Sequence, residues 1–259
     1  MAPYLTDNHK IVINPGRTLG AYLFKQYLVN AGCTLDIPIC ETDTFVLTSR
    51  RVRPGVSQIF SRKKKLRVAA LNPQHSEIIY KCLKPSFNMI QMEDSVLTTS
   101  LSNIGMLFHP FPALMNLSRI ECKDTYHHYK EGITPLVANF VEKLDEERLA
   151  LAKAFKINIP SAFEWLDIVY GSQGDSLYLR LQATSQYDEI LSPSDITTRY
   201  IYEDIPTGIV PMLELAKLAN TPHKHMELVL ELANSLYNID FSIIGRNDVK
   251  GFFKDYFPK

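Results

Sequence analysis

The chain has 259 residues, of which 46% are hydrophobic and 22% charged, and its 28 basic and 28 acidic side chains cancel to a formal net charge of zero. This composition is typical of a globular protein and excludes a disordered or fibrous chain. Zero net charge gives no overall attraction to nucleic acid or to an anionic membrane, so we expect neither as a partner. No apolar run approaches the roughly 20 residues that a membrane-spanning helix needs.

The cysteines and histidines show no disulfide framework and no metal-ligand pattern. The four cysteines form no CxxC pair and lack zinc-ligand spacing; they are Cys33, Cys40, Cys82 and Cys122. The histidine pairs at 127–128 and 223–225 lack i, i+4 spacing, so we expect structural histidines and no metal site. No basic-then-apolar leader follows Met1, and unpaired cysteines suit a reducing compartment, which predicts a cytoplasmic protein.

Residues 1 to about 90 alternate short apolar runs with one amphipathic segment, which predicts an α/β part. Residues 11–13 read as a buried strand that ends in a turn at residues 14–16. Thr18 is expected to cap the helix that follows. The apolar side chains of that helix share one face; they are Leu19, Tyr22, Leu23, Tyr27 and Leu28. Together with the next apolar run, LDIPIC, these segments predict a βαβ unit.

Residues 49–75 contain no acidic side chain and eight basic ones. The basic residues are Arg50, Arg51, Arg53, Arg62, Lys63, Lys64, Lys65 and Arg67. The simplest interpretation is two strands joined by an exposed basic hairpin at residues 61–65, since charge runs usually mark exposed turns. The alternative is an anion-attracting rim or a nucleic-acid site, and salt-sensitive binding to arbitrary DNA would distinguish the two.

From about residue 91 the pattern becomes helical and stays so. One helix is expected over residues 94–108, ended by His109 and Pro110, and a longer one over residues 135–155. Thr221 and Pro222 resemble the cap and first residue of a helix that runs to about residue 237. The sequence therefore predicts an α/β domain at residues 1–92 followed by an all-α domain at residues 93–259.

Common catalytic fingerprints are absent from the chain. It contains no GxGxxG, Walker loop, GxSxG or HExxH motif. His109 ends an apolar-faced helix and has a proline on each side of Phe111 beyond it, which suits either a core histidine or a functional one. Arg199, Glu203 and Asp204 would by themselves form a surface ion-pair group.

Several strings, in this order and spacing, resemble those of the octopine and other opine dehydrogenases. They are APYLTDNHKIVINPGRT, ETDTFVLTSR, TTSLSNIGMLFHPFPALMN, YKEGITP, LDEER, RYIYEDIPTGIVP and GRNDVKGF. The most specific parts are the pattern of Asn103, His109 and Pro110 and the five-residue spacing from Arg199 to Asp204. These enzymes use NAD(P)H to join an amino acid reductively to a 2-oxo acid, so the resemblance implies NAD or NADP as cofactor and these two acids as substrates.

The resemblance also implies a fold and an organisation. Residues 1–92 correspond to the C-terminal half of a Rossmann-type NAD(P)-binding sheet, and residues 93–259 to the family's helical substrate domain. In the family, the first strand and the glycine-rich phosphate turn precede the APYL string, and that glycine motif is absent from this chain. Activity is then expected to need that segment, supplied upstream or by a separate N-terminal chain. The alternative is a truncated, catalytically incomplete remnant or subunit that serves as a structural or interaction domain; a homodimer is also possible.

Three residues match the family's catalytic centre. His109 matches the catalytic histidine, which suits proton transfer because its unperturbed pKa lies at about 6.5. Asp204 matches its partner, where a carboxylate on the second ring nitrogen would fix the tautomer and favour the protonated form. Arg199 matches the neighbouring arginine, whose planar fork suits a substrate carboxylate.

Further residues are expected near the ligands. The resemblance makes Asn103 an orienting donor, and Glu41 with Thr42 a site for the substrate amino group. Trp165 either lines the amino-acid pocket or belongs to the core. The residues that end the first strand are expected near the nicotinamide ribose, or otherwise form an ordinary turn; they are Asn14, Pro15 and Gly16.

Overall fold

The computed structural model describes the backbone of residues 1–256 and the side chains of these residues except 50–52, 255 and 256. The chain separates into two units. The first unit comprises residues 1–103 and the described part of the segment from Lys250, and the second unit comprises residues 104–249. The functional domain boundary predicted after residue 92 stays a prediction.

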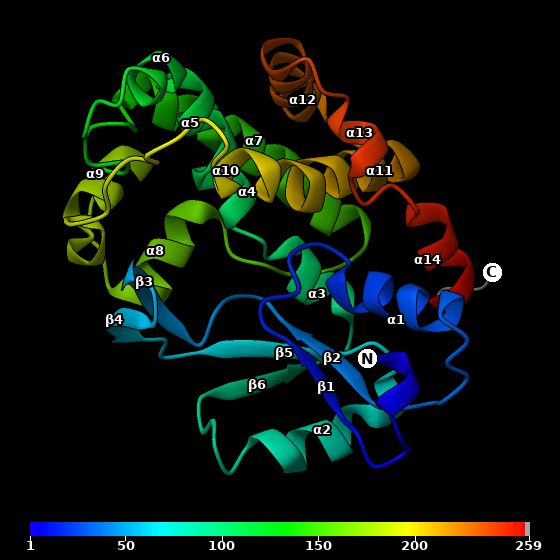
Figure 1. Ribbon diagram of the computed structural model, residues 1–259. Coiled ribbons are helices and arrows are strands. Elements are labelled where there is room, and N and C mark those ends of the chain that lie inside the picture. The colour runs from blue at the N-terminus through cyan, green and yellow to red at the C-terminus, as the bar shows by residue number, and fades with distance from the viewer. Residues whose placement is uncertain (257–259) are drawn as a thin grey trace. The chain divides into compact units, whose positions relative to one another are not determined.

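The first unit contains a four-stranded sheet, a separate hairpin and short helices (Figure 1). Its elements are η1 (Ala2–Tyr4), β1 (Ile11–Ile13), α1 (Gly20–Asn30), β2 (Ile39–Thr42), β3 (Leu47–Arg53), β4 (Val56–Arg62), β5 (Leu66–Ala70), η2 (Pro73–His75), α2 (Ser76–Leu83), β6 (Ile90–Glu93) and α3 (Val96–Leu101). Helix α14 (Val249–Tyr256) ends the described chain, and its Phe252 packs edge-on against Tyr22 of α1. Helices α1 and α3 lie on one face of the sheet and α2 on the other (Figure 1).

The sheet has the order β1-β2-β5-β6 and mixed strand directions. Strands β1 and β2 are parallel and joined by α1, which confirms the predicted βαβ unit. Strand β5 runs antiparallel to β2, and β6 parallel to β5. This reversal follows from the connection, since only the β3–β4 hairpin links β2 to β5, whereas a parallel pair needs a crossover. The core under the sheet is formed by Cys40, Leu66, Val68, Ala70, Ile79 and Ile90.

Two local predictions for the first βαβ unit are wrong. Strand β1 is not buried, because it lies at the edge of the sheet and leaves Val12 41% exposed. Thr18 does not cap the helix; α1 begins after Leu19 with no side-chain cap, and the buried Thr18 hydroxyl donates to the backbone oxygen of Ser100. The Thr18 hydroxyl, which the sequence pattern predicted as the helix cap, therefore forms a tertiary hydrogen bond instead.

The predicted turn of the basic hairpin is also wrong. Strands β3 and β4 pair antiparallel around Pro54 and Gly55, and Gly55 has a φ of +77°, a conformation that glycine adopts without strain. Residues 61–65 instead lead from β4 into β5, and Lys63 is buried. The side chains of Arg50 and Arg51 lie outside the described residues. The interpretation followed the charge run, whereas the glycine sets the turn.

The second unit is built of helices (Figure 1). They are α4 (Gly105–Phe108), α5 (Pro110–Met115), α6 (Leu117–Glu121), α7 (Pro135–Ala154), α8 (Ala162–Tyr170), α9 (Leu177–Ala183), η3 (Ser185–Tyr187), α10 (Arg199–Tyr202), the π-helical η4 (Ile205–Ile209), α11 (Val210–Ala219), α12 (Lys224–Tyr237) and α13 (Phe241–Ile244). A small mixed sheet followed by helices confirms the predicted fold class, α/β followed by all-α. Within the described chain, no helix combines the length and the apolar character needed to cross a membrane.

Helix α7 organises the second unit and matches the predicted long helix. Its Arg148 has no exposed surface and binds Asp145 through Nε at 2.8 Å. Glu147, also buried, accepts hydrogen bonds from the backbone N–H groups of His225 and Met226 at the start of α12. The predicted cap at Thr221 is therefore wrong, because a carboxylate from another helix satisfies these N–H groups.

The helix predicted over residues 94–108 is two helices, α3 and α4. Helix α3 ends at Leu101, where the hydroxyl of Ser102 donates to the backbone oxygen of Thr98 at 2.7 Å. Asn103 directs its side-chain amide to the hydroxyl of Thr18. Polar side chains that bond locally or to other segments compete with helical continuation, which an apolar period alone does not reveal.

Candidate functional site

His109 lies at the junction of α4 and α5, where Pro110 begins the new helix. Proline is favoured at a first helical position because its missing N–H is not needed there. The junction leaves the His109 side chain 11% exposed, so its imidazole is largely withdrawn from solvent. Its Nδ1 lies 2.8 Å from Oδ2 of Asp204, which is 95 positions later in the chain. The structure thus brings together the two residues predicted as the catalytic pair.

Asp204 lies between α10 and η4 and has no exposed surface. An ionised carboxylate can only accept a hydrogen bond, so Nδ1 of His109 carries the hydrogen in this pair. In the neutral ring, Nε2 is then the nitrogen that can accept a proton. The buried carboxylate therefore determines which ring nitrogen can exchange a proton with another molecule.

Two tyrosines hold the same imidazole. The hydroxyl of Tyr129 lies 3.1 Å from Nε2 of His109. The ring of Tyr200 stacks on the imidazole, with centroids 4.1 Å apart and planes inclined by 9°. Sequence reasoning assigned neither residue a role, although Tyr129 opens the YKEGITP string and Tyr200 lies within RYIYED. We call His109, Asp204, Tyr129 and Tyr200 the His109 site.

Arg199 adjoins this site because it lies against the ring of Tyr200. Its side chain is exposed, and its guanidinium carbon lies 5.4 Å from the centroid of the Tyr200 ring. One ring therefore contacts both the imidazole and the guanidinium. An exposed planar cation beside a largely buried histidine can bind a carboxylate close to a proton-transfer group.

Trp165 belongs to an aromatic cluster that adjoins the His109 site. This half-buried side chain of α8 packs against Phe108 and against Tyr170, with ring centroids 6.5 and 5.5 Å apart. Tyr170 in turn contacts Tyr187, which stacks on Tyr129 at 3.9 Å. Burial, followed by the influence of Tyr170, raises the pKa of Tyr187 well above its ordinary value of 10.0, so this phenol stays neutral.

The other predicted site residues lie in the first unit. Glu41 has no exposed surface, and its Oε1 accepts hydrogen bonds from the hydroxyls of Thr99 and Ser100, both at 2.8 Å. Its Oε2 accepts from the backbone N–H of Ala21 in the first turn of α1. A Cβ placed on Gly16 would lie 2.5 Å from this carboxylate. Glu41 therefore ties β2, α1 and α3 together.

The turn after β1 is tied to the end of β2. The side-chain amide of Asn14 donates to the hydroxyl of Thr42 at 2.6 Å and to the backbone oxygen of Thr44 at 3.0 Å. Gly16, two residues on, donates its N–H to the backbone oxygen of Thr42, and Pro15 lies between. The carboxyl ends of two parallel strands meet here, which is where nucleotides gather in α/β sheets. Backbone segments in this position could hold a nicotinamide nucleotide.

Asn103 lies in the interior of the first unit. It is 2% exposed and its Nδ2 donates to the Thr18 hydroxyl at 3.3 Å.

Among the described residues, no group of three or more His, Cys, Asp or Glu side chains is placed to hold a metal ion.

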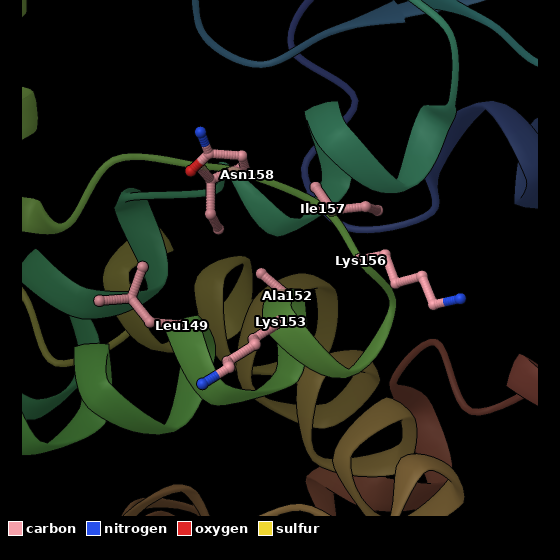
Figure 2. A pocket seen from close by; sticks show the side chains of 7 residues that line it. Leu149, Ala152, Lys153, Lys156, Ile157 and Asn158 are labelled. Carbon is pink, nitrogen blue, oxygen red and sulfur yellow. The ribbon is translucent and has the colours of Figure 1, made fainter.

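A pocket of about 380 Å³ opens at the C-terminal end of α7 (Figure 2). It is lined by Leu149, Ala152, Lys153, Lys156, Ile157, Asn158 and Ile159. Figure 2 shows the two lysine side chains pointing in different directions. None of the predicted site residues lines this pocket, and its two lysine side chains do not converge.

Comparisons with known proteins point to one family. Residues 92–237 match the family model described as NAD/NADP octopine/nopaline dehydrogenase, alpha-helical domain. Opine dehydrogenase of Arthrobacter sp. (strain 1C) is 35% identical over 246 residues, which are 95% of this chain and 68% of that protein. The ocs protein of Agrobacterium tumefaciens (strain Ach5) is 25% identical over 222 residues, 81% of this chain and 59% of that protein.

Solved structures resemble the fold. Octopine dehydrogenase with NADH and L-arginine superposes with a TM-score of 0.71 at 17% identity, covering 96% of this chain and 68% of that one. Yersinopine dehydrogenase with NADP⁺ gives a TM-score of 0.69 at 15% identity, covering 96% and 66%. At these identities the likeness concerns the fold: a Rossmann-like part and a helical domain.

Proposed function

The chain belongs to the NAD/NADP octopine/nopaline dehydrogenase family, and from this premise we propose that it catalyses the NAD(P)H-dependent reductive condensation of an amino acid with a 2-oxo acid. The observation that carries the proposal is the 2.8 Å contact between His109 and the fully buried Asp204. It lies within the helical domain that the family model matches. The first unit supplies the nucleotide-binding end of a sheet.

The chemistry requires control of protons and of two carboxylates. The amine and the carbonyl first condense with loss of water to an imine. NADH or NADPH, when bound, would supply a hydride to the carbon of the protonated imine, which gives a secondary amine. The chain's own residues must therefore supply and remove protons and hold the substrate carboxylates in register.

His109 is proposed to move the proton at Nε2, because its Nδ1 hydrogen is held by Asp204. In the direction of opine formation, the protonated ring gives a proton to the hydroxyl that leaves as water. In the reverse direction, neutral Nε2 takes that proton back from the water that adds to the imine. The Asp204 carboxylate stabilises the positive charge that the ring acquires in between.

Arg199 is proposed to bind a carboxylate of one substrate. Its side chain is exposed and lies against Tyr200, the ring that also stacks on His109. A guanidinium presents parallel N–H donors that match the two carboxylate oxygens. A substrate held in this way would have its reacting carbon near the imidazole.

NAD or NADP is proposed to bind at the carboxyl ends of β1 and β2, near Asn14, Pro15 and Gly16. The support is the parallel pairing of these strands and the presence of NADH or NADP⁺ in structures of similar fold. The glycine-rich phosphate motif is not part of this chain. The roles predicted for Asn103, Glu41, Thr42 and Trp165, the homodimer and the cytoplasmic location stay predictions.

The test compares the chain as it stands with a version extended at its N-terminus to the length of the relatives. Calorimetry with NADH and NADPH measures cofactor binding, and a panel of amino acids with 2-oxo acids is followed by oxidation of the nicotinamide and by mass spectrometry of the secondary amine. We expect binding and product in the extended version. Product only in that version would favour the incomplete-chain alternative for this chain, and no product in either would contradict the proposal.

A further inference from the structure

The hydroxyl of Tyr129 contacts the ring nitrogen that the proposed reaction uses. We propose that Tyr129 is a positioning residue, whose hydroxyl holds Nε2 of His109 while Asp204 holds Nδ1. The inference rests on the proposed function, since it assigns Tyr129 a part in the same proton transfer. It concerns a residue for which neither sequence pattern nor family resemblance indicated a role.

The imidazole is held at three places. Asp204 lies 2.8 Å from Nδ1 and Tyr129 lies 3.1 Å from Nε2, both within ordinary hydrogen-bond distance. Tyr200 covers the face of the ring at 4.1 Å. These two hydrogen bonds and the stacking contact together oppose rotation of the side chain. The proton-transfer group is therefore aligned before a substrate arrives.

A hydroxyl at Nε2 suits both protonation states of the ring. When His109 is neutral, Nε2 accepts a hydrogen bond and the Tyr129 O–H donates it. When His109 is protonated, Nε2–H donates and the Tyr129 oxygen accepts. Once Nε2 has gained or lost its proton, a rotation of the hydroxyl restores the hydrogen bond with no movement of the ring. Phenylalanine at this position would keep the ring packing and lose the hydrogen bond to Nε2 in both protonation states.

Tyr129 is itself held firmly. Its ring stacks on Tyr187 with centroids 3.9 Å apart, and it meets His128 edge-on at 4.9 Å. His128 has no exposed surface, and its Nε2 bonds to the backbone oxygen of Phe108, the residue before His109. A fixed ring fixes the hydroxyl, so the position of Nε2 is set by packing rather than by solvent.

The proposal predicts an effect on turnover rather than on substrate binding. Tyr129 is 5% exposed, so it has little surface to offer to a substrate. A substrate nitrogen or oxygen must compete with the tyrosine hydroxyl for Nε2. That hydroxyl keeps the ring aligned until the substrate atom takes its place. Besides Tyr129, the titratable and charged groups around the imidazole include Asp204, Tyr200 and His128, with Arg199 beyond Tyr200.

The experiment compares Tyr129→Phe with the matched control Tyr126→Phe. The Tyr126 side chain is also buried, and its hydroxyl has no hydrogen-bond partner among the described residues. Nitrogen NMR of the labelled imidazole, assigned by its loss in His109→Gln, reports the hydrogen bond at Nε2 and its pH titration. Steady-state kinetics of opine oxidation report kcat, KM and the pH profile of kcat/KM.

We expect Tyr129→Phe to displace the Nε2 resonance and the acidic limb of the pH profile, and to lower kcat about tenfold with little change in KM. Tyr126→Phe should leave all of these unchanged. An unaltered Nε2 resonance in Tyr129→Phe would overturn the inference, as would an altered resonance with normal kcat. Absence of turnover in the unmodified, extended protein would instead contradict the proposed function, while the NMR comparison would still decide whether Tyr129 holds the ring.

Discussion

Asp204 in the second unit and Glu41 in the first are both carboxylates with no exposed surface, yet their partners differ in kind. Asp204 bonds to an imidazole, a group that gains and loses a proton near neutral pH. Glu41 bonds to two hydroxyls and a backbone N–H, none of which titrates there. Burial alone therefore does not distinguish the carboxylate that we propose to be catalytic; the two differ in whether the hydrogen-bond partner can exchange a proton.

The comparison also separates the two kinds of damage that a substitution can cause. Removing a charge that directs a proton should lower the rate and leave the fold intact. Removing a charge that satisfies buried donors should lower the free energy of unfolding, because unpaired buried donors are costly. His109→Gln tests the first kind of damage and Glu41→Ala tests the second.

The largest effect is expected for His109→Gln. Glutamine can still bond to Asp204 and Tyr129 but cannot transfer a proton, so kcat for opine formation should fall about a thousandfold. The free energy of unfolding should change by no more than about 1 kcal/mol, because the hydrogen bonds are retained. Kinetics and urea unfolding measure the two, with His9→Gln, at an exposed histidine, as control. Turnover close to that of the control would remove His109 from the mechanism.

Glu41→Ala should lower the free energy of unfolding rather than the rate. It leaves the hydroxyls of Thr99 and Ser100 and the N–H of Ala21 without their carboxylate, and we expect the free energy of unfolding to fall by about 3 kcal/mol. Glu41→Gln should cost less, because its oxygen can accept from the backbone N–H while its amide donates to the two hydroxyls. Chemical denaturation of both variants checks this, and equal losses would contradict the hydrogen-bond explanation.

Asp43, two residues after Glu41, adds a pH-dependent case. Burial raises its pKa from 3.8 to about 6, against the opposing effect of Arg67. The folded state then binds a proton that the unfolded state releases, so its stability should fall as pH rises from about 4 to 6, by up to about 3 kcal/mol. Asp43→Asn should flatten this part of the stability curve, measured by urea unfolding at several pH values. If the free energy of unfolding depended on pH in the same way in the variant, a group other than Asp43 would be responsible.

Features that depend on local sequence were predictable, and features that depend on distant contacts were not. The βαβ unit and helix α7 were predictable because they depend on local periodicity. The turn at Gly55 and the start of α12 were not, since one was masked by a run of charge and the other is capped by Glu147 from a distant helix. Family resemblance predicted His109 and Asp204 as a pair, whereas Tyr129 lies in a loop without periodicity, and only the structure shows its contact with His109.

The smallest effect is expected for a substitution of Arg199, an exposed charge in contrast to the two buried carboxylates. Five residues before the buried Asp204, it is exposed and lies beside Tyr200. Lysine keeps the charge but not the planar fork, so Arg199→Lys should raise the KM of one carboxylate-bearing substrate about tenfold with a smaller change in kcat. Arg119→Lys is the matched control, because Arg119 also lies over a tyrosine ring, that of Tyr126. If both variants raise KM alike, the effect is not specific to Arg199; if neither does, the substrate carboxylate is bound elsewhere.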